Sequence, residues 1–332
     1  MNAFELLKSR GQRVKRLGCK VWREVREQYP AALQKQVGAK TRRDRAMAQR
    51  RFVFWTVHYQ IHSVAHVKRK HVEAYCRYLE ERMLCPSTIA TELSHLAVLL
   101  RTLGKPQWLD DRESLFADPS ILTRSLVATK DKSIEAAGLA FEAIYAAAWS
   151  INPRVAVQLA LCWHFGLRVQ EAWCFRPHLS VQDGFVRVKW GAKGGRPRTL
   201  SELTDEQRYL IELAKTFAAT EAESTVPRRM SLKAWKAVFY RVTKRIGLTR
   251  AKWGVTPHSL RHSFAHRQHE RATRRLAPVQ GGTLAQDDPS ADRAAREIVA
   301  EELGHSRASI AAAYIGGTRV PSEAEAGQRG AG

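Results

Sequence analysis

The chain has 332 residues, of which 44% are hydrophobic and 26% charged, and these proportions are typical of a folded protein rather than a disordered one. Its formal net charge of +23 favours a polyanionic partner, nucleic acid above all, although a basic surface with no specific partner would have the same composition. No apolar run reaches the roughly 20 residues of a membrane span and no secretory signal opens the chain. We therefore expect a cytoplasmic protein without a membrane partner.

The first part of the chain is predicted to contain a basic arm and a helical domain. Residues 1–50 are dense in Lys and Arg with few acids, which predicts an N-terminal arm that is partly helical around Val21 to Tyr29 and lies on DNA phosphates, or else a flexible solvated tail. Within residues 51–128, Ile89, Leu93 and Leu96 recur at helical spacing, so we expect a compact helical unit. The cysteines show no C-x-x-C spacing and predict neither a zinc ribbon nor a disulfide framework.

A second domain is expected over residues 133–316, after a short polar stretch. A helix closed by Gly166 is followed by two strands on either side of Asp183-Gly184, a dipeptide suited to a tight hairpin turn. A third strand is predicted to end near Leu200. The predicted fold class is therefore α+β, mainly α with a small antiparallel β-sheet.

Helical signals return after the predicted sheet. Thr204 and Gln207 form a capping box, and a helix is predicted over residues 231–246. Residues 272–292 are rich in Gly, Pro, Ala and Asp and predict a loop that interrupts a helical region. The tail, residues 317–332, is rich in Gly, Ala and Glu and is expected to be disordered.

One motif combines a histidine and an arginine near a predicted helix start. Thr256 is suited to the N-cap and Pro257 to the first helical position, which would place His258 and Arg261 on one face. A helix N-terminus with these two side chains suits an anion such as a phosphate. A rival interpretation is a zinc site built from histidines spaced four apart, either His58, His62 and His66 or His258, His262 and His266. Neither set has a Cys or carboxylate at ligand spacing, so we expect no metal.

Three motifs together resemble those of the tyrosine recombinase (phage integrase) family. Gly166-Leu167-Arg168-Val169-Gln170-Glu171-Ala172 is similar to the family's first arginine box, His258-Ser259-Leu260-Arg261-His262-Ser263-Phe264-Ala265 to its second, and Leu303-Gly304-His305, with Tyr314 nine residues on, to its third. The resemblance covers about residues 133–314, and residues 51–128 stand where the family has its core-binding domain. The resemblance is to a branch of the integrases that has an insert before the Gly-His box, and residues 272–292 are that insert in this chain.

The resemblance also implies the roles of individual residues. The catalytic residues would be Arg168, His258, Arg261 and His305 around the scissile phosphate, Lys193 as the acid for the departing 5′ oxygen, and Tyr314 as the nucleophile. Lys193 is chosen because Gly191-Ala192-Lys193-Gly194-Gly195-Arg196-Pro197-Arg198 is similar to the turn after the second strand in which the family has its lysine. Lys189 is the substitute for Lys193, and Glu171 would orient the site. DNA strands would be cut and rejoined through a 3′-phosphotyrosyl intermediate without metal, cofactor or ATP. The implied partners are double-stranded DNA, a homotetramer on paired sites, and an accessory DNA-bending or directionality factor.

The residue types also suit this chemistry by themselves. A tyrosine hydroxyl, with an ordinary pKa of about 10, attacks near pH 7 only in an electrostatic site that favours the phenolate or beside a base. Guanidiniums offer forked donors to phosphate oxygens, and a lysine can protonate a departing alkoxide. Two alternatives stay open on the sequence alone. One is a type IB topoisomerase-like enzyme that relaxes DNA, and the other is a non-catalytic DNA-binding protein.

Overall fold

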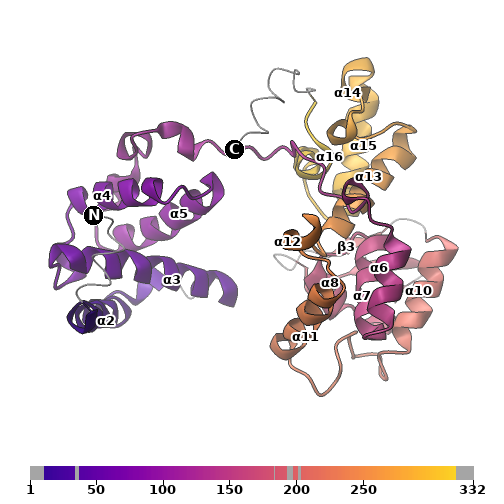
Figure 1. Cartoon of the computed structure of the whole chain (residues 1–332), viewed down its shortest axis with the longest axis horizontal. Coiled ribbons are helices and arrows are strands. Elements are labelled where there is room, and N and C mark those ends of the chain that lie inside the picture. The colour runs from indigo at the N-terminus through magenta and orange to yellow at the C-terminus, as the bar shows by residue number, and fades with distance from the viewer. Residues whose placement is uncertain (1–10, 34–36, 183, 193–196, 201–202, 319–332) are drawn as a thin grey trace. The chain divides into compact units, whose positions relative to one another are not determined.

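The computed structural model describes residues 11–33, 37–182, 184–192, 197–200 and 203–318. The chain divides after Ser125 into two compact units, called here the N-terminal unit and the C-terminal unit (Figure 1). Helices predominate in both, and the described strands all lie in the C-terminal unit. The predicted fold class, mainly α with a small antiparallel sheet, is confirmed. No helix in the described ranges is both long and apolar enough to cross a bilayer.

The N-terminal unit is a helical bundle. Its described α-helices are α2 (Gly11–Gln28), α3 (Ala39–Thr56), α4 (Arg69–Glu81) and α5 (Pro86–Thr102), and short 3-10 turns lie between α2 and α3 and between α3 and α4. In α5 the apolar residues predicted from their spacing, Ile89, Leu93 and Leu96, are all buried, and α5 packs on α3. The helical pattern read from the sequence here is therefore present in the structure.

The described part of residues 1–50, for which a basic arm is predicted, is helical and contributes to the core of the N-terminal unit. Val21 and Val25 of α2 are fully buried and belong to the same core as Phe52 and Val53 of α3. These valines are four apart and form an apolar stripe, whereas the lysines and arginines around them lie on the solvent side. The described residues of this segment are thus part of the folded bundle.

The C-terminal unit surrounds a small sheet with helices. Its elements in chain order are α6 (Phe141–Trp149), α7 (Pro153–His164), α8 (Val169–Cys174), α9 (Pro177–Ser180), β1 (Val181–Gln182), β2 (Phe185–Val188), β3 (Arg198–Thr199), α10 (Asp205–Lys215), α11 (Leu232–Arg245), α12 (Arg250–Trp253), α13 (Ser259–Thr273), α14 (Leu284–Asp287), α15 (Pro289–Glu302) and α16 (Ala312–Ile315). The sheet order is β1-β2-β3 with both pairings antiparallel. Val186 and Val188 point into the core from β2. The predicted hairpin and third strand are confirmed, although Asp183 lies outside the described residues.

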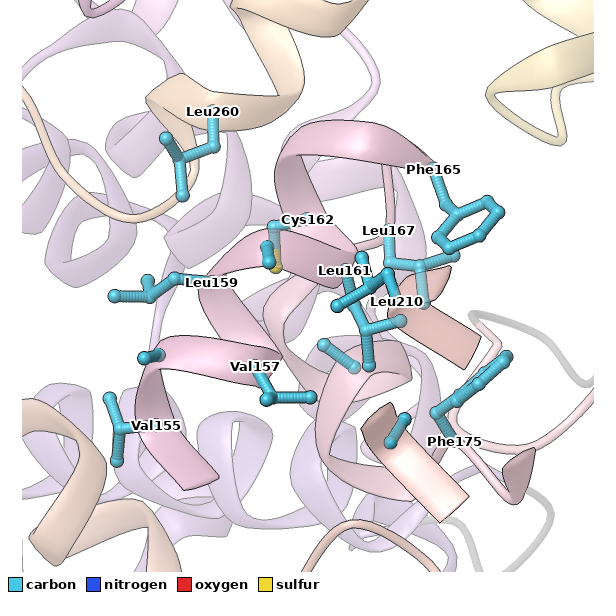
Figure 2. Packing of buried hydrophobic residues seen from close by; sticks show 14 of the residues in the cluster. Val155, Val157, Leu159, Leu161, Cys162, Phe165, Leu167, Phe175, Leu210 and Leu260 are labelled. Atoms are coloured by element: carbon cyan, nitrogen blue, oxygen red, sulfur yellow. The ribbon is translucent and has the colours of Figure 1, made fainter. Parts of the chain in front are cut away.

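The core of this unit is built around α7. Val155, Val157, Leu159 and Leu161 are fully buried, so this helix is covered on all sides (Figure 2). Side chains from later elements close around it, among them Leu210 of α10. A buried α7 gives a rigid base for the loop that follows it, and that loop carries the first motif.

The loop predicted over residues 272–292 is shorter in the structure. α13 continues to Thr273, a 3-10 turn and α14 occupy the middle, and α15 starts at Pro289. The carboxylate of Asp288 caps α15 by accepting from the N–H groups of Ser290 and Ala291 at 3.2 and 3.0 Å. The prediction was wrong at this end, because the overall Gly, Pro and Asp content hid an Asp-Pro helix start.

Candidate active site

The three motifs meet in the C-terminal unit. Nε of Arg261 donates to the Tyr314 hydroxyl at 3.2 Å, and Nη2 of Arg261 lies 3.5 Å from Nε2 of His305. Nη2 of Arg168 approaches the same imidazole nitrogen at 3.4 Å. The ring of His258 lies 6.1 Å from that of Tyr314 between centroids. Two arginines, two histidines and a tyrosine distant in sequence are thus brought together.

The predicted Lys193 falls outside the described residues. The alternative, Lys189, is described, and its ammonium lies over the ring of Trp190, 5.8 Å from the centroid.

Arg168 is positioned by the turn between α7 and α8. Gly166 has φ +57°, and a Cβ there would lie 2.4 Å from Cδ1 of Phe264, so both the turn and the close approach require glycine. Arg168 precedes α8, where its N–H donates to Glu171 at 2.8 Å and its guanidinium donates to the same carboxylate at 2.7 Å. The Arg168 side chain is 22% exposed, so it can reach a ligand.

The start of α13 differs from the prediction by two residues. α13 begins at Ser259 instead of Pro257, and Thr256 is not its N-cap. The Ser259 hydroxyl accepts from the Thr256 N–H at 3.2 Å, and the intervening residues form a turn. The prediction of the cap was wrong, yet His258 and Arg261 still meet in the site.

Arg261 is the buried centre of the site, with no exposed surface. Its guanidinium donates to the Leu303 carbonyl at 2.6 Å and, by a short contact, to the Gly166 carbonyl, in addition to the Tyr314 hydroxyl. Burial lowers the pKa of Arg261 to about 10, so the group stays charged at pH 7. One side chain therefore ties the first and third motifs to the second.

Gly304 shapes the turn that presents His305. It ends α15 with φ +68°, and a Cβ on it would lie 2.6 Å from Cδ of Arg198. Burial, together with the charges of Arg261 and Arg168, lowers the pKa of His305 to about 4. The imidazole is therefore neutral at pH 7 when the site is empty.

A buried carboxylate holds the arginines in place. Glu171 has no exposed side-chain surface and pairs with Arg168 at 2.7 Å, Arg198 at 2.9 Å and Arg261 at 3.9 Å. Burial alone raises the pKa of this carboxyl, but the guanidiniums outweigh it and lower the pKa to about 2. The sequence pointed to Glu171 but gave no role to Arg198, which comes from β3 and stands at the end of the segment that resembles the family's lysine turn.

Tyr314 lies among imidazole rings and is only 8% exposed. The His262 ring is 4.9 Å from the Tyr314 ring and 5.4 Å from that of His258. Burial and the adjacent histidines lower the pKa of His262 to about 3, and the pKa of His258 is lowered by burial of its ring and by Arg261. Sequence reasoning gave His262 no role in this site, although it stands one helical turn after His258.

A cleft of about 810 Å³ opens beside Tyr314. The basic residues in its lining are Lys130, Lys132 and Arg250, and the cleft is also lined by His258 and His262. Trp253 adds an exposed aromatic face. Asp131 is the acid in the lining. The cleft thus offers mainly positive charge next to the hydroxyl, which suits a polyanion. Across the described ranges, no three His, Cys, Asp or Glu side chains are grouped as a metal ion requires.

Comparisons with known proteins find similarity to integrases and tyrosine recombinases. A family model described as integrase matches residues 122–267, which contain the first two motifs. A tyrosine recombinase XerC of Natranaerobius thermophilus is 23% identical over 221 residues, or 64% of this chain and 73% of that protein. A λ integrase dimer bound to a COC′ core site superposes with a TM-score of 0.56 at 18% identity, covering 88% of this chain and 75% of that one. A λ integrase tetramer bound to a Holliday junction gives 0.52 at 16%, covering 91% and 78%.

Proposed function

We propose, from the chain's membership of the tyrosine recombinase family, that it is a site-specific DNA recombinase that cuts and rejoins DNA strands through Tyr314. The match to the integrase family model, the XerC relative and the fold shared with λ integrase support this function. The observation that carries the assignment of the site is the hydrogen bond from Arg261 to the Tyr314 hydroxyl, beside Arg168 and His305.

The first step of the proposed reaction is capture of the scissile phosphate. The Arg168 side chain is partly exposed, and Glu171 binds its Nη1. Its remaining N–H donors can therefore point at a non-bridging phosphate oxygen. His258 and His305, neutral at pH 7, can each donate one N–H to the phosphate. The charge that develops on the phosphoryl oxygens is stabilised by donors already in place, which is the largest single source of rate enhancement in such sites.

In the second step the Tyr314 oxygen attacks phosphorus and the bond to the 5′ oxygen breaks. The Arg261 donor stabilises the phenolate as it forms, and a neutral imidazole can take the hydroxyl proton. The 5′ oxygen needs a proton as it leaves, and we assign its donor to Lys193 on the resemblance of its turn to that of the family. The product is a 3′-phosphotyrosyl bond that keeps the energy of the phosphodiester, so a second strand can be joined without ATP.

DNA is the proposed partner of both units. The C-terminal unit, predicted over residues 133–316, carries the chemistry, and the helical unit predicted over residues 51–128 adds contacts to the duplex. The net charge of +23 supports phosphate contacts that are independent of sequence. A λ integrase relative is described as a tetramer on a Holliday junction, and we propose that this chain also exchanges strands as a tetramer on paired sites.

The test replaces the nucleophile. Tyr314→Phe removes only the hydroxyl, so DNA affinity should stay within about twofold while strand cleavage is lost. Tyr240→Phe is the matched control, because this tyrosine lies on α11 against Trp173. Cleavage by Tyr314→Phe at the wild-type rate would refute the site. Relaxation of plasmids without any recombination between paired sites would favour the topoisomerase-like alternative.

A further inference from the structure

The helix that carries Tyr314 is too short to be stable on its own. α16 spans only Ala312–Ile315, a single turn that continues the 3-10 turn Ala308–Ala311, and so short a helical segment has no stability of its own in water. The carbonyls at its end have no partner within the helix and must be satisfied from elsewhere. The position of the Tyr314 hydroxyl therefore depends on the side chains that bind those carbonyls.

We infer that His266, oriented by Asp131, is a positioning residue that fixes Tyr314 for attack. His266 lies on α13, one turn beyond His262, and is 4% exposed. Its Nε2 lies 3.0 Å from the Tyr314 carbonyl oxygen. A carbonyl can only accept, so Nε2 carries the hydrogen and donates it. The inference rests on the proposed function, since it concerns the same nucleophile.

Asp131 faces the other nitrogen of the same ring. One carboxylate oxygen of Asp131 lies 3.7 Å from Nδ1 of His266, and Nδ1 has no hydrogen-bond partner among the described residues. That oxygen also accepts from the Ser133 N–H at 2.7 Å, which fixes the carboxylate. The carbonyl and the carboxylate both only accept, so together they orient the imidazole when each of its nitrogens carries a hydrogen.

The segment that contains Asp131 also contacts α16 directly. The Ala128 N–H donates to the Ala312 carbonyl at 2.8 Å. The first residues of the C-terminal unit therefore hold both ends of α16, at Ala312 through the backbone and at Tyr314 through Asp131 and His266. This arrangement ties the position of the nucleophile to the segment that directly follows the N-terminal unit in the chain.

A second histidine on α13 provides a matched control. His269 has no exposed side-chain surface, its Nδ1 lies 3.3 Å from the Arg275 carbonyl, and its Nε2 lies 3.9 Å from Asp292. It thus faces a carbonyl and a carboxylate as His266 does, but its carbonyl belongs to the loop after α13 instead of α16. Replacing either histidine removes a similar buried group from the same helix.

The experiment measures single-turnover cleavage of a nicked suicide duplex at saturating DNA, and DNA affinity separately. His266→Phe keeps the volume but removes the donor, and its cleavage rate should fall at least about tenfold with affinity within about twofold. His266→Gln places an amide N–H where Nε2 was and should recover most of the rate. His269→Phe should cleave within about threefold of wild type.

Asp131→Asn keeps an acceptor for Ser133 but removes the charge that faces His266. Its cleavage rate should fall about threefold, and it should cause no further loss in a chain that already carries His266→Phe. Independent losses in the double variant would contradict the pairing of the two residues.

The inference is overturned if His266→Phe cleaves at the wild-type rate, or if His266→Gln and His269→Phe lose as much as His266→Phe. A Tyr314→Phe protein that still cleaves would instead contradict the proposed function. The two failures are therefore distinguished by different variants.

Discussion

The buried carboxylate of Glu171 should be the residue on which the stability of the site depends most. Glu171→Gln keeps the shape but removes the charge that faces Arg168, Arg198 and Arg261. The pKa of Glu171 is about 2 in the folded chain against an ordinary 4.5, and this difference is equivalent to about 3 kcal/mol of stability at pH 7. Leaving buried guanidiniums without their partner gives a cost of the same order, about 3–5 kcal/mol.

The pH dependence has a definite sign. A carboxyl with a lowered folded pKa stabilises the chain at pH values above its unfolded pKa, and this contribution is lost as the pH falls from about 4.5 toward 2. About half of it should be gone near pH 3. The difference between wild type and Glu171→Gln should therefore be full at pH 7 and shrink in acid.

The assay is unfolding in urea, monitored through hydrogen exchange of peptides from the C-terminal unit. Unfolding of the N-terminal unit then does not contribute to the signal. Glu212→Gln is the control, because Glu212 pairs with Lys215 at 2.7 Å but is 68% exposed. Its effect should stay below about 1 kcal/mol. Equal stability of Glu171→Gln and wild type at pH 7, or a difference that does not change with pH, would refute the reasoning.

Two further predictions concern the turn before His305 and the basic cleft. Gly304→Ala should lower the free energy of unfolding by about 1–3 kcal/mol more than Gly138→Ala, as measured in urea, because both glycines have positive φ but only at Gly304 would the new Cβ meet a neighbour, Arg198. Equal effects would show that the close approach is unimportant. Lys132→Ala removes a cation from the cleft lining and should weaken binding of all duplexes alike while reducing the slope of log affinity against log salt by about one, as measured by titration from 50 to 200 mM salt. An unchanged slope would place the DNA phosphates elsewhere.

Local features of the fold could be predicted from the sequence. The capping box of Thr204 and Gln207 is present at the start of α10, because it depends on residues three apart. The hairpin formed by β1 and β2 follows from alternation and a turn dipeptide, which are equally local. A helix is predicted around Val21, but the many cations of residues 1–50 give no indication that Val21 and Val25 are buried in a core.

The site was only partly predictable, because its motifs are local in the sequence whereas several contacts that support it are not. Arg168, His258, Arg261, His305 and Tyr314 stand in recognisable motifs, and the structure brings them together. Glu171, which holds the arginines, stands in the first motif, but two other groups that support the site do not stand in the three motifs. Arg198 reaches Glu171 from a strand, and Asp131 approaches His266 from far back in the chain. Contacts between residues this distant in sequence follow from tertiary packing, which a single sequence without covariation does not reveal.

The central claim is that Tyr314 forms a covalent bond to DNA. The most direct measurement incubates the protein with nicked suicide duplexes taken from the DNA that flanks its own reading frame, without metal or ATP, and maps the adduct by peptide mass. The account predicts a single adduct on Tyr314, attached to the 3′ phosphate, and no adduct with Tyr314→Phe. An adduct on another tyrosine, or salt-sensitive binding with no adduct on any of these duplexes, would contradict it.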